Sequence, residues 1–406
     1  MATSITFNLL LTDFDNIQEI NVYRSETPHD TSALGTPYAT IPKSTVEYTD
    51  PDATFGSTYY YLLESVFTSG DKRYSSEEKV TVGEMIYLPN NANTTYVFNF
   101  DGHYQREYQH TNAGNTCYID CDSKGNMYIG GNAHTFEARD QNNNQIWNSS
   151  YSPADVKDIV YGNNGIVYVF DQSGYISKVN ALDGSNVSRI RPNGGTTTKL
   201  FVDDQYNMYS THTGEIYVYG DDDTYMWHHS PHASGTIYSI LVDPEGFVYT
   251  GNSSNEIKKF KYDGVVGTEN FNPYSFTDEW SRTLDSTVWD IKRRSEYPDE
   301  IYVLTQAKLY ILNKNDGTII SEFETTGVAG RRLTVTEMKY FIVTESGTNS
   351  NGLFMFKPDG TLFWNETVMS KSSAAYDTAI LPGKQSIAYG FHQRSTGTTS
   401  DGTTTP

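Results

Sequence analysis

Residues 122–131, DSKGNMYIGG, hold the phrase that decides the fold of this chain. An aspartate opens a tight turn through Gly125 and Asn126, and a short strand centred on Tyr128 follows it. Similar phrases recur along the chain at intervals of 40, 41, 40, 53, 39 and 48 residues, centred on Tyr168, Tyr209, Tyr249, Tyr302, Phe341 and Tyr389. The sequence therefore repeats one short structural unit.

Each unit contains the signals of four strands. A strand such as TCYID at 116–120 precedes the phrase, and a hairpin strand with a terminal turn follows it, as in KLYILNKNDGTII at 308–320. A period near 40 residues with four strands per repeat predicts a β-propeller in which each repeat forms one blade. The phrases predict seven blades over residues 92–395, and six or eight remain alternatives because the 53-residue interval is open to a miscount.

The two ends of this region complement each other. The last unit, at 374–391, offers about two strands, whereas residues 94–108 supply hairpin strands that lack a partner unit. Joining the two segments would complete the last blade from both ends and leave no open sheet edge. The tail at 396–406 has low complexity and few apolar residues, so we expect it to be disordered in isolation.

The second hairpins resemble the quinoprotein-type propeller repeat, whose last strand ends in tryptophan. Tryptophan stands at that position in three units: Trp147, Trp227 and Trp364. The corresponding positions elsewhere are assigned to Val187, Val266 and Ile320. Enzymes with this repeat gather quinone and Ca²⁺ ligands from several blades, and the sequence shows no such ligand set. The resemblance therefore implies the fold, and we expect no cofactor.

The first ninety residues carry strand signals about every ten residues, which predicts a small β-sandwich over 1–86. The motifs INVYRS at 20–25 and VEYTDPDATFGSTYYYLLESV at 46–66 resemble a fibronectin type III domain. In that resemblance Tyr59 corresponds to the tyrosine whose hydroxyl ties a loop back to a strand, and Tyr61 and Leu63 follow it into the core. Such domains serve as spacers, docking modules or adhesive units.

Charge and hydropathy exclude several classes of partner. The chain has 29 basic and 50 acidic residues, a net charge of −21, so its surface repels phosphate backbones and anionic headgroups. We therefore expect neither a nucleic-acid nor a membrane partner. The N-terminus lacks the basic segment and long apolar run of a signal peptide, which predicts a protein made in a cytoplasm.

Two clusters contain side chains that bind metals elsewhere. MWHHSPH holds His228, His229 and His232, but adjacent strand residues point to opposite faces, so a solvent-facing loop is favoured over a metal site. The run Asp221 to Asp223 lacks the alternating oxygen ligands of a Ca²⁺ loop and is interpreted as an acidic hairpin tip. We expect no metal site.

Acidic side chains recur on the predicted inner strands at Asp120, Asp158 and Asp290. Carboxylates from different blades can form a glycosidase pair without any local motif, but a repeated acid at a strand end favours a structural role. The serine-hydrolase, zinc-protease and phosphate-loop motifs are absent from the sequence. We therefore expect a non-enzymatic protein without catalytic residues.

The long interval in the fifth unit departs from the repeat and is rich in aromatic residues. Its candidate contact residues are Phe271, Tyr274, Phe276 and Trp280, with Trp289 nearby. On a loop, such rings could stack on sugars or contact a protein. Packing over the blade as a satellite core is the favoured alternative.

Taken together, these features predict a structural or adhesion protein of a bacteriophage virion, such as a decoration or tail protein. The N-terminal sandwich would dock on other virion proteins, and the propeller would be displayed toward a host-surface glycan or protein. Two alternatives remain open: a secreted carbohydrate-active or quinone-dependent enzyme, and a bacterial surface adhesin.

Overall fold

A computed structural model describes the chain between residues 4 and 390. It leaves out the following positions within that span: 11–15, 46, 54–56, 76, 82–84, 91–93, 103, 111–115, 132–133, 141–142, 150–153, 193–196, 266–273, 326–329, 346–351, 367–377 and 382–383. The described part is all-β, with 36 strands and no α-helix. None of its segments is a helix of the length and apolar character needed to cross a membrane.

The chain divides into two compact units. One groups residues 1–85, 99–105 and 382–406, and the other groups residues 86–98 and 106–381. The second unit is thus inserted into the sequence of the first.

The second unit contains six sheets of four consecutive antiparallel strands. The first three sheets are β11 (Thr116–Cys121), β12 (Met127–Gly131), β13 (Phe136–Arg139) and β14 (Gln145–Ser149); β15 (Val156–Gly162), β16 (Ile166–Asp171), β17 (Ile176–Asn180) and β18 (Asn186–Ile190); and β19 (Thr197–Val202), β20 (Met208–His212), β21 (Ile216–Tyr219) and β22 (Tyr225–His229). The next three are β23 (Ile237–Val242), β24 (Phe247–Asn252), β25 (Glu256–Val265) and β26 (Tyr274–Thr283); β27 (Val288–Lys292), β28 (Glu300–Thr305), β29 (Lys308–Asn313) and β30 (Ile319–Glu324); and β31 (Gly330–Val335), β32 (Phe341–Glu345), β33 (Leu353–Phe356) and β34 (Leu362–Glu366).

A seventh four-stranded sheet combines both ends of this unit. Its order is β10 (Tyr104–Gln109), β9 (Thr94–Phe98), β8 (Met85–Asn90) and β35 (Ala379–Leu381). The hydroxyls of Thr334 on β31 and Thr378 beside β35 lie 2.6 Å apart, and the rings of Phe98 and Trp364 have centroids 6.3 Å apart. The last consecutive sheet therefore contacts this two-ended sheet.

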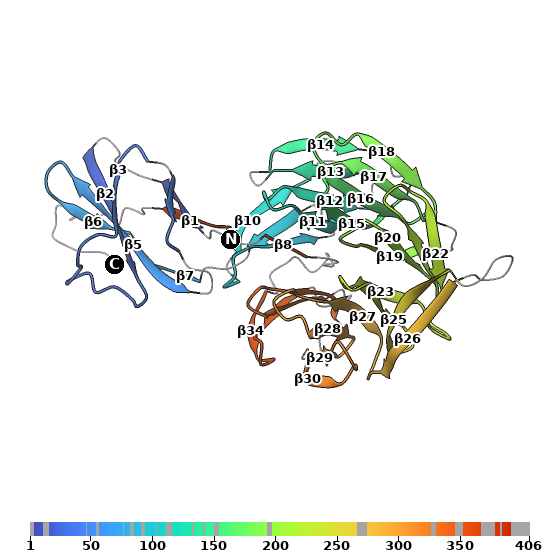
Figure 1. Cartoon of the computed structure of the whole chain (residues 1–406). Helices are drawn as coiled ribbons and strands as arrows, with labels where there is room; N and C mark the ends of the chain where they lie inside the picture. Colours follow the sequence, from blue (N-terminus) through green and yellow to red (C-terminus); the bar gives the residue numbers. More distant parts are fainter. Residues whose placement is uncertain are drawn as a thin grey trace. The chain divides into compact units, whose positions relative to one another are not determined.

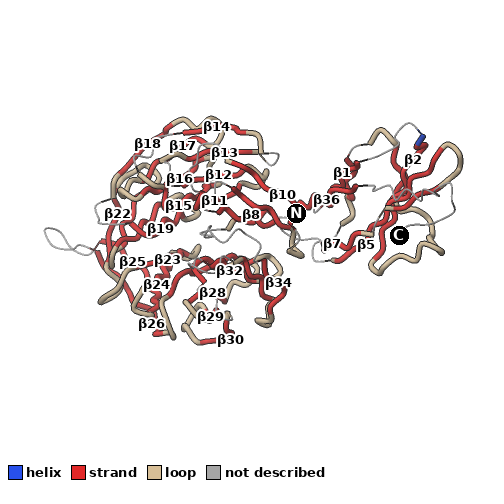
Figure 2. Tube along the Cα trace, turned by 180° about the vertical axis from the view of Figure 1, so that it is seen from behind, coloured by secondary structure: helices blue, strands red, loops and turns tan. Residues whose placement is uncertain are grey.

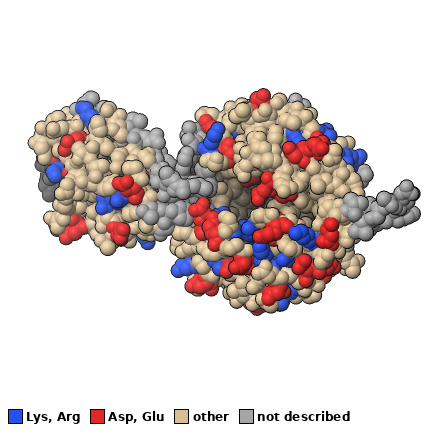
Figure 3. Space-filling view, in the orientation of Figure 1, with Lys and Arg blue, Asp and Glu red and all other residues tan. Residues whose placement is uncertain are grey.

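The sheets lie around a common centre. In the consecutive sheets, Figure 1 shows the first strand, such as β11, β15, β23 or β27, toward the centre and the fourth, such as β14, β18, β26 or β30, outside, and Figure 2 shows the arrangement from behind. First strands of successive sheets contact each other from β11 to β31. This is the architecture of a β-propeller. On the propeller face seen in Figure 3, acidic and basic side chains are interspersed.

The repeated phrase has a structural explanation. In three copies the phrase tyrosine donates its hydroxyl to the aspartate that opens the turn, at 3.2, 3.0 and 3.0 Å: Tyr128 to Asp122, Tyr209 to Asp203 and Tyr249 to Asp243. The same aspartate accepts backbone amide hydrogen bonds within its turn, as Asp122 does from Lys124 and Asn126. In these three copies the phrase is therefore a hairpin whose turn aspartate is fastened by the phrase tyrosine.

The phrase around Tyr389 is an exception, and its prediction was wrong. Tyr389 lies on β36 (Lys384–Gly390), which pairs in parallel with β1 (Ser4–Leu10) of the first unit. The sequence between β35 and β36 is Pro382–Gly383, and proline cannot donate a ladder hydrogen bond. The end of the chain therefore contributes one strand to the propeller, not the two that we expected.

The first unit contains two sheets. One has the order β36, β1 and β4 (Glu47–Asp50). The other has the order β3 (Ala39–Pro42), β2 (Ile17–Ser25), β5 (Thr58–Phe67) and β6 (Lys72–Tyr74), with β7 (Glu78–Thr81) also paired to β5. Tyr59, Tyr61 and Leu63 of β5 lie together in the core of this unit.

Asp50 is the polar centre of the first unit, with no exposed surface. It accepts hydrogen bonds from Tyr61 at 2.7 Å and Tyr38 at 2.7 Å, and Arg24 forms a salt bridge to it at 2.9 Å. Burial alone would raise the pKa of Asp50, but the hydrogen bonds from Tyr61 and Tyr38 outweigh it and lower the pKa. Tyr61 thus fastens β5 to Asp50, the last residue of β4.

Candidate functional site: the extended hairpin and its groove

Trp147 shows how adjacent sheets of the propeller are joined. Its indole Nε1 donates to the carbonyl of Ala181 at 2.8 Å. The indole also lies against Gly184, where an added Cβ would come within 2.8 Å of the ring. The tryptophan of one sheet thus docks on the terminal turn of the next sheet.

Trp280 on β26 docks in the same way. Its Nε1 donates to the carbonyl of Lys314 at 3.1 Å, and its ring lies against Gly317. The assignment of Val266 to this position was wrong, because hairpin β25–β26 is longer than the sequence suggested and Trp280 pairs opposite Lys259. Val266 lies outside the described residues.

Two further assignments fell on exposed residues. Val187 and Ile320 are 54% and 53% exposed, and on β30 it is the ring of Phe323 that lies against a glycine of the next sheet, Gly360. The tryptophan dock is therefore absent at these two strands.

Trp227 on β22 departs from the pattern. In the docks of Trp147 and Trp280, the accepting carbonyl and the glycine against the ring stand 34 and 37 positions downstream. For Trp227 these positions are Lys261 and Gly264. Here the chain does not turn at Gly264. Strand β25 continues to Val265, with a register shift between Tyr262 and Gly264.

The consequence is an undocked indole. No described residue accepts a hydrogen bond from Nε1 of Trp227, although the side chain is only 3% exposed. Its ring stacks on Tyr262 with centroids 5.4 Å apart and meets the edge of Phe276 at 5.3 Å. The extended hairpin has replaced the docking turn by an aromatic contact.

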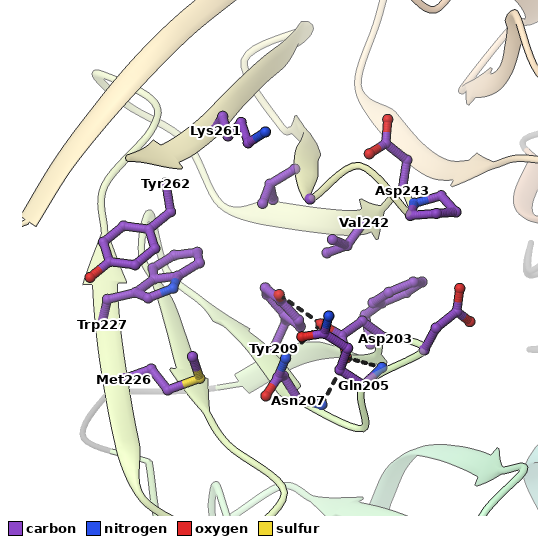
Figure 4. Close-up of a pocket in the computed structure, with 15 residues that line it drawn as sticks. Asp203, Gln205, Asn207, Tyr209, Met226, Trp227, Val242, Asp243, Lys261 and Tyr262 are labelled. Atoms are coloured by element: carbon purple, nitrogen blue, oxygen red, sulfur yellow. Dashed lines mark hydrogen bonds between the residues drawn. The ribbon is translucent and has the colours of Figure 1, made fainter. Parts of the chain in front are cut away.

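A groove of about 400 Å³ lies beside this indole, between the β19–β22 and β23–β26 sheets. Figure 4 shows Trp227 and Tyr262 on one side, with the indole nitrogen toward the groove, and the turn that carries Asp203, Gln205 and Asn207 on another. The remaining lining residues are Phe201, Asp204, Tyr209, Met226, Val242, Asp243, Pro244, Gly246, Val248 and Lys261. The groove combines aromatic surface with amide, carboxylate and ammonium groups.

Two carboxylates of the groove are engaged by other groups of the protein. Asp203 accepts bonds from its own turn and from the hydroxyl of Tyr209 at 3.0 Å. Burial raises the pKa of Asp243, which has Nζ of Lys314 4.0 Å away. The Lys261 ammonium lies 4.8 Å from the centre of the Phe247 ring. The lining of the groove thus carries more acidic than basic side chains.

The predicted contact residues lie on or near the extended hairpin. Tyr274 meets the ring of His228 at 5.8 Å, and Phe276 stacks on His229 at 3.9 Å. Trp280 docks on the following sheet, and Phe271 lies outside the described residues. The three described rings thus pack against neighbouring sheets.

The three histidines of the cluster do not point to a common site, and their assignment to a solvent-facing loop was wrong. His228 and His229 end strand β22, whereas His232 is 6% exposed between Glu256 at 2.7 Å and Thr250 at 2.9 Å. Burial lowers the pKa of His229 to about 4. The described residues contain no group of acidic, histidine or cysteine side chains that could hold a metal.

Asp222 binds Thr224 within its own turn, whereas other acidic residues singled out in the sequence make contacts between sheets. Asp223 forms a salt bridge with Lys178 of the preceding sheet at 2.8 Å. The three inner-strand acids each accept a backbone amide bond from the next sheet: Asp120 from Tyr161, Asp158 from Leu200 and Asp290 from Leu333. These carboxylates hold the ring together.

Trp289 belongs to a second aromatic group, on three successive first strands. Its ring stacks on Tyr238 with centroids 4.5 Å apart, and the Arg331 guanidinium lies 4.5 Å from the ring centre. Sequence reasoning missed this group, because its members stand more than 40 residues apart.

Comparison with known proteins supports the fold. No family model and no curated protein sequence matches the chain. The computationally designed protein Ika8 is similar in structure, with a TM-score of 0.54 at 11% identity over 74% of this chain and 93% of that one. The β-propeller domain of Cps50 (Swd1) from Myceliophteria thermophila has a TM-score of 0.54 at 10% identity, over 64% of this chain and 90% of that one. At such identities the likeness shows the propeller fold alone.

Proposed function

We propose that the protein is a non-enzymatic structural and adhesion protein of a bacteriophage virion. Its N-terminal unit is a fibronectin type III-like sandwich that docks on other virion proteins. Its propeller has seven blades and is displayed for contact with a glycan or protein of the host surface.

The observation that carries this proposal is the parallel pairing of β1 with β36, from Ser4 opposite Lys384 to Leu10 opposite Gly390. The strands on either side of the propeller in the sequence are thereby joined in one sheet. The first and last segments of the propeller are then both joined along the chain to that unit. Such a double attachment suits a module that is displayed under mechanical load, because both of its ends are held by one anchor.

Three further observations support the details. The seven four-stranded sheets fit seven blades. Tyr48 of β4 packs against the core that β2, β3, β5 and β7 build around the tyrosines of β5, an arrangement compatible with a fibronectin type III-like unit. The inner-strand acids bind backbone amides of the next sheet, which supports a scaffold role for them.

The test is mass spectrometry of purified virions of the phage that encodes the chain, followed by chemical cross-linking. We expect the protein in the particles, with cross-links from residues 1–85 to other virion proteins. Absence from the particles would refute the virion assignment, and recovery in a bacterial envelope fraction would favour the adhesin alternative. Turnover of polysaccharides or alcohols by the purified protein would favour an enzyme.

A further inference from the structure

We propose that the groove beside Trp227 binds one pyranose ring of a neutral surface glycan. This inference rests on the proposed function, since it assigns the adhesive contact to a defined place on the propeller.

The groove exists because one hairpin breaks the repeat. Lys261 and Gly264 occupy the positions that accept the indole hydrogen bond and pack against the ring in the other docks. Here both residues belong to strand β25, which continues past them without turning. Asp263, next to that glycine, accepts a hydrogen bond from Thr277 of β26 at 2.7 Å and so helps to hold the extended hairpin. A turn at Gly264 would place the docking carbonyl against the indole. The extension leaves a groove of about 400 Å³ beside it.

The Trp227 indole offers a hydrogen-bond donor to the groove. Its side chain is 3% exposed, and no described residue accepts its N–H, which faces the groove. The nitrogen is not among the buried polar atoms that lack a partner, so it is open to the groove, where water or a ligand can accept its hydrogen bond. A sugar hydroxyl at this point would accept a hydrogen bond from Trp227, as the carbonyl of Ala181 does from Trp147.

The rest of the lining matches a hydroxyl-rich ring. Tyr262 and Phe201 offer aromatic surface to the apolar C–H face of a pyranose. The exposed amide of Gln205 both donates and accepts, as sugar hydroxyls do. A cavity of this volume also lies within the range of roughly 300–1,000 Å³ that holds small ligands.

Charge disfavours the other small ligands. Asp203, Asp204 and Asp243 line the groove against the single cation Lys261, which opposes phosphates and other anions. A strongly cationic ligand is disfavoured because Asp203 is already occupied by hydrogen bonds and burial raises the pKa of Asp243. A neutral saccharide satisfies both conditions.

The test uses the full-length protein on an array of defined bacterial surface oligosaccharides. Isothermal titration with the monosaccharide shared by the bound glycans then gives the affinity. We expect Trp227→Phe, which keeps a ring but removes the N–H, to weaken binding at least tenfold. Gln205→Trp, at an exposed position, should block the groove to the same extent without disturbing the core.

Trp280→Phe is the matched control, because it removes an indole N–H that is already bonded to Lys314. It should leave the affinity within twofold of the parent. No binding to any array glycan, or affinities within twofold for both groove variants, would overturn the inference. Either result leaves the virion assignment intact if particles contain the protein, whereas glycan binding by a protein absent from virions would refute only that assignment.

Discussion

The carboxylate of Asp290 on β27 accepts a hydrogen bond from the backbone amide of Leu333 on β31, 3.0 Å away. The bond crosses from one sheet of the propeller to the next, and Leu333 has no exposed surface. Burial alone would raise the pKa of Asp290, but the charges of Lys292 and Lys199 outweigh it and lower the pKa. The ring of sheets is thus held by buried polar bonds as well as by apolar packing.

Replacing this carboxylate should destabilise the propeller. Asp290→Ala leaves the Leu333 amide unpaired in the core, so we expect a loss of about 2–4 kcal/mol in the free energy of unfolding. Asp290→Asn keeps an acceptor and should cost less. Urea unfolding measures both, and Asp316→Ala, at an exposed turn aspartate that binds Thr318, is the control. Equal losses for Asp290→Ala and the control would contradict the role.

Replacing the docked Trp280 and the undocked Trp227 should affect the stability of the propeller differently. Trp280→Phe removes a hydrogen bond to Lys314, whereas Trp227→Phe removes none to any described residue. We therefore expect Trp280→Phe to destabilise the propeller by about 1 kcal/mol more than Trp227→Phe. Thermal unfolding of the two variants gives the comparison. A larger loss for Trp227→Phe would show that the undocked indole is bonded in solution.

Asp50 should govern the acid stability of the first unit. Its pKa is lowered in the folded protein, so its contribution is present above the unfolded value of about 4 and is lost as pH falls through the folded pKa. Asp50→Ala should cost about 3–5 kcal/mol at neutral pH, because Arg24 loses its buried partner. Unfolding of the wild-type protein and the variant between pH 7 and about pH 3 tests this. The difference between them should shrink toward the acidic end, and a constant difference would contradict it.

His229 should make the propeller sensitive to mild acid in a different range. Burial lowers its pKa to about 4 from an unfolded value near 6.5, so the unfolded chain binds the extra proton first as pH falls. Stability contributed by neutral His229 is therefore full above about pH 6.5 and declines below it. His229→Phe keeps the stacking on Phe276 and removes the titration. Its unfolding free energy should vary less between pH 7 and 5 than that of the parent; an unchanged slope would rule His229 out as the cause.

Several features were accessible from the sequence because they are local. The phrase around Tyr128 uses a turn aspartate, a glycine and a tyrosine within seven residues, so its repetition reveals the hairpins. The strands at 94–108 were expected in the closing sheet, and β9 and β10 lie there. Trp147 was placed correctly at a strand end, because its hairpin has the regular length.

Other features depend on what happens between distant segments. The position given to Val266 failed because the sequence Asp263–Gly264 signals a turn, yet the chain passes through it in a strand held by β26. Tyr389 was placed in the propeller because its phrase resembles the repeat, but its strand pairs with β1, almost the full chain length away. His232 looked solvent-facing, and only the packing of β24 and β25 against it shows that it is buried.

The sequence by itself determined that this protein is an all-β chain with a propeller of four-stranded repeats, since hairpin turns and strand alternation are written in neighbouring residues. Tertiary structure alone decided which indole remains undocked, which strand closes the ring and where a groove opens. Those outcomes follow from the choice between a turn and a longer strand at Gly264, and from the partner that β36 finds. Both outcomes depend on how strongly a strand pairs with residues far along the chain, and no local sequence pattern encodes that pairing.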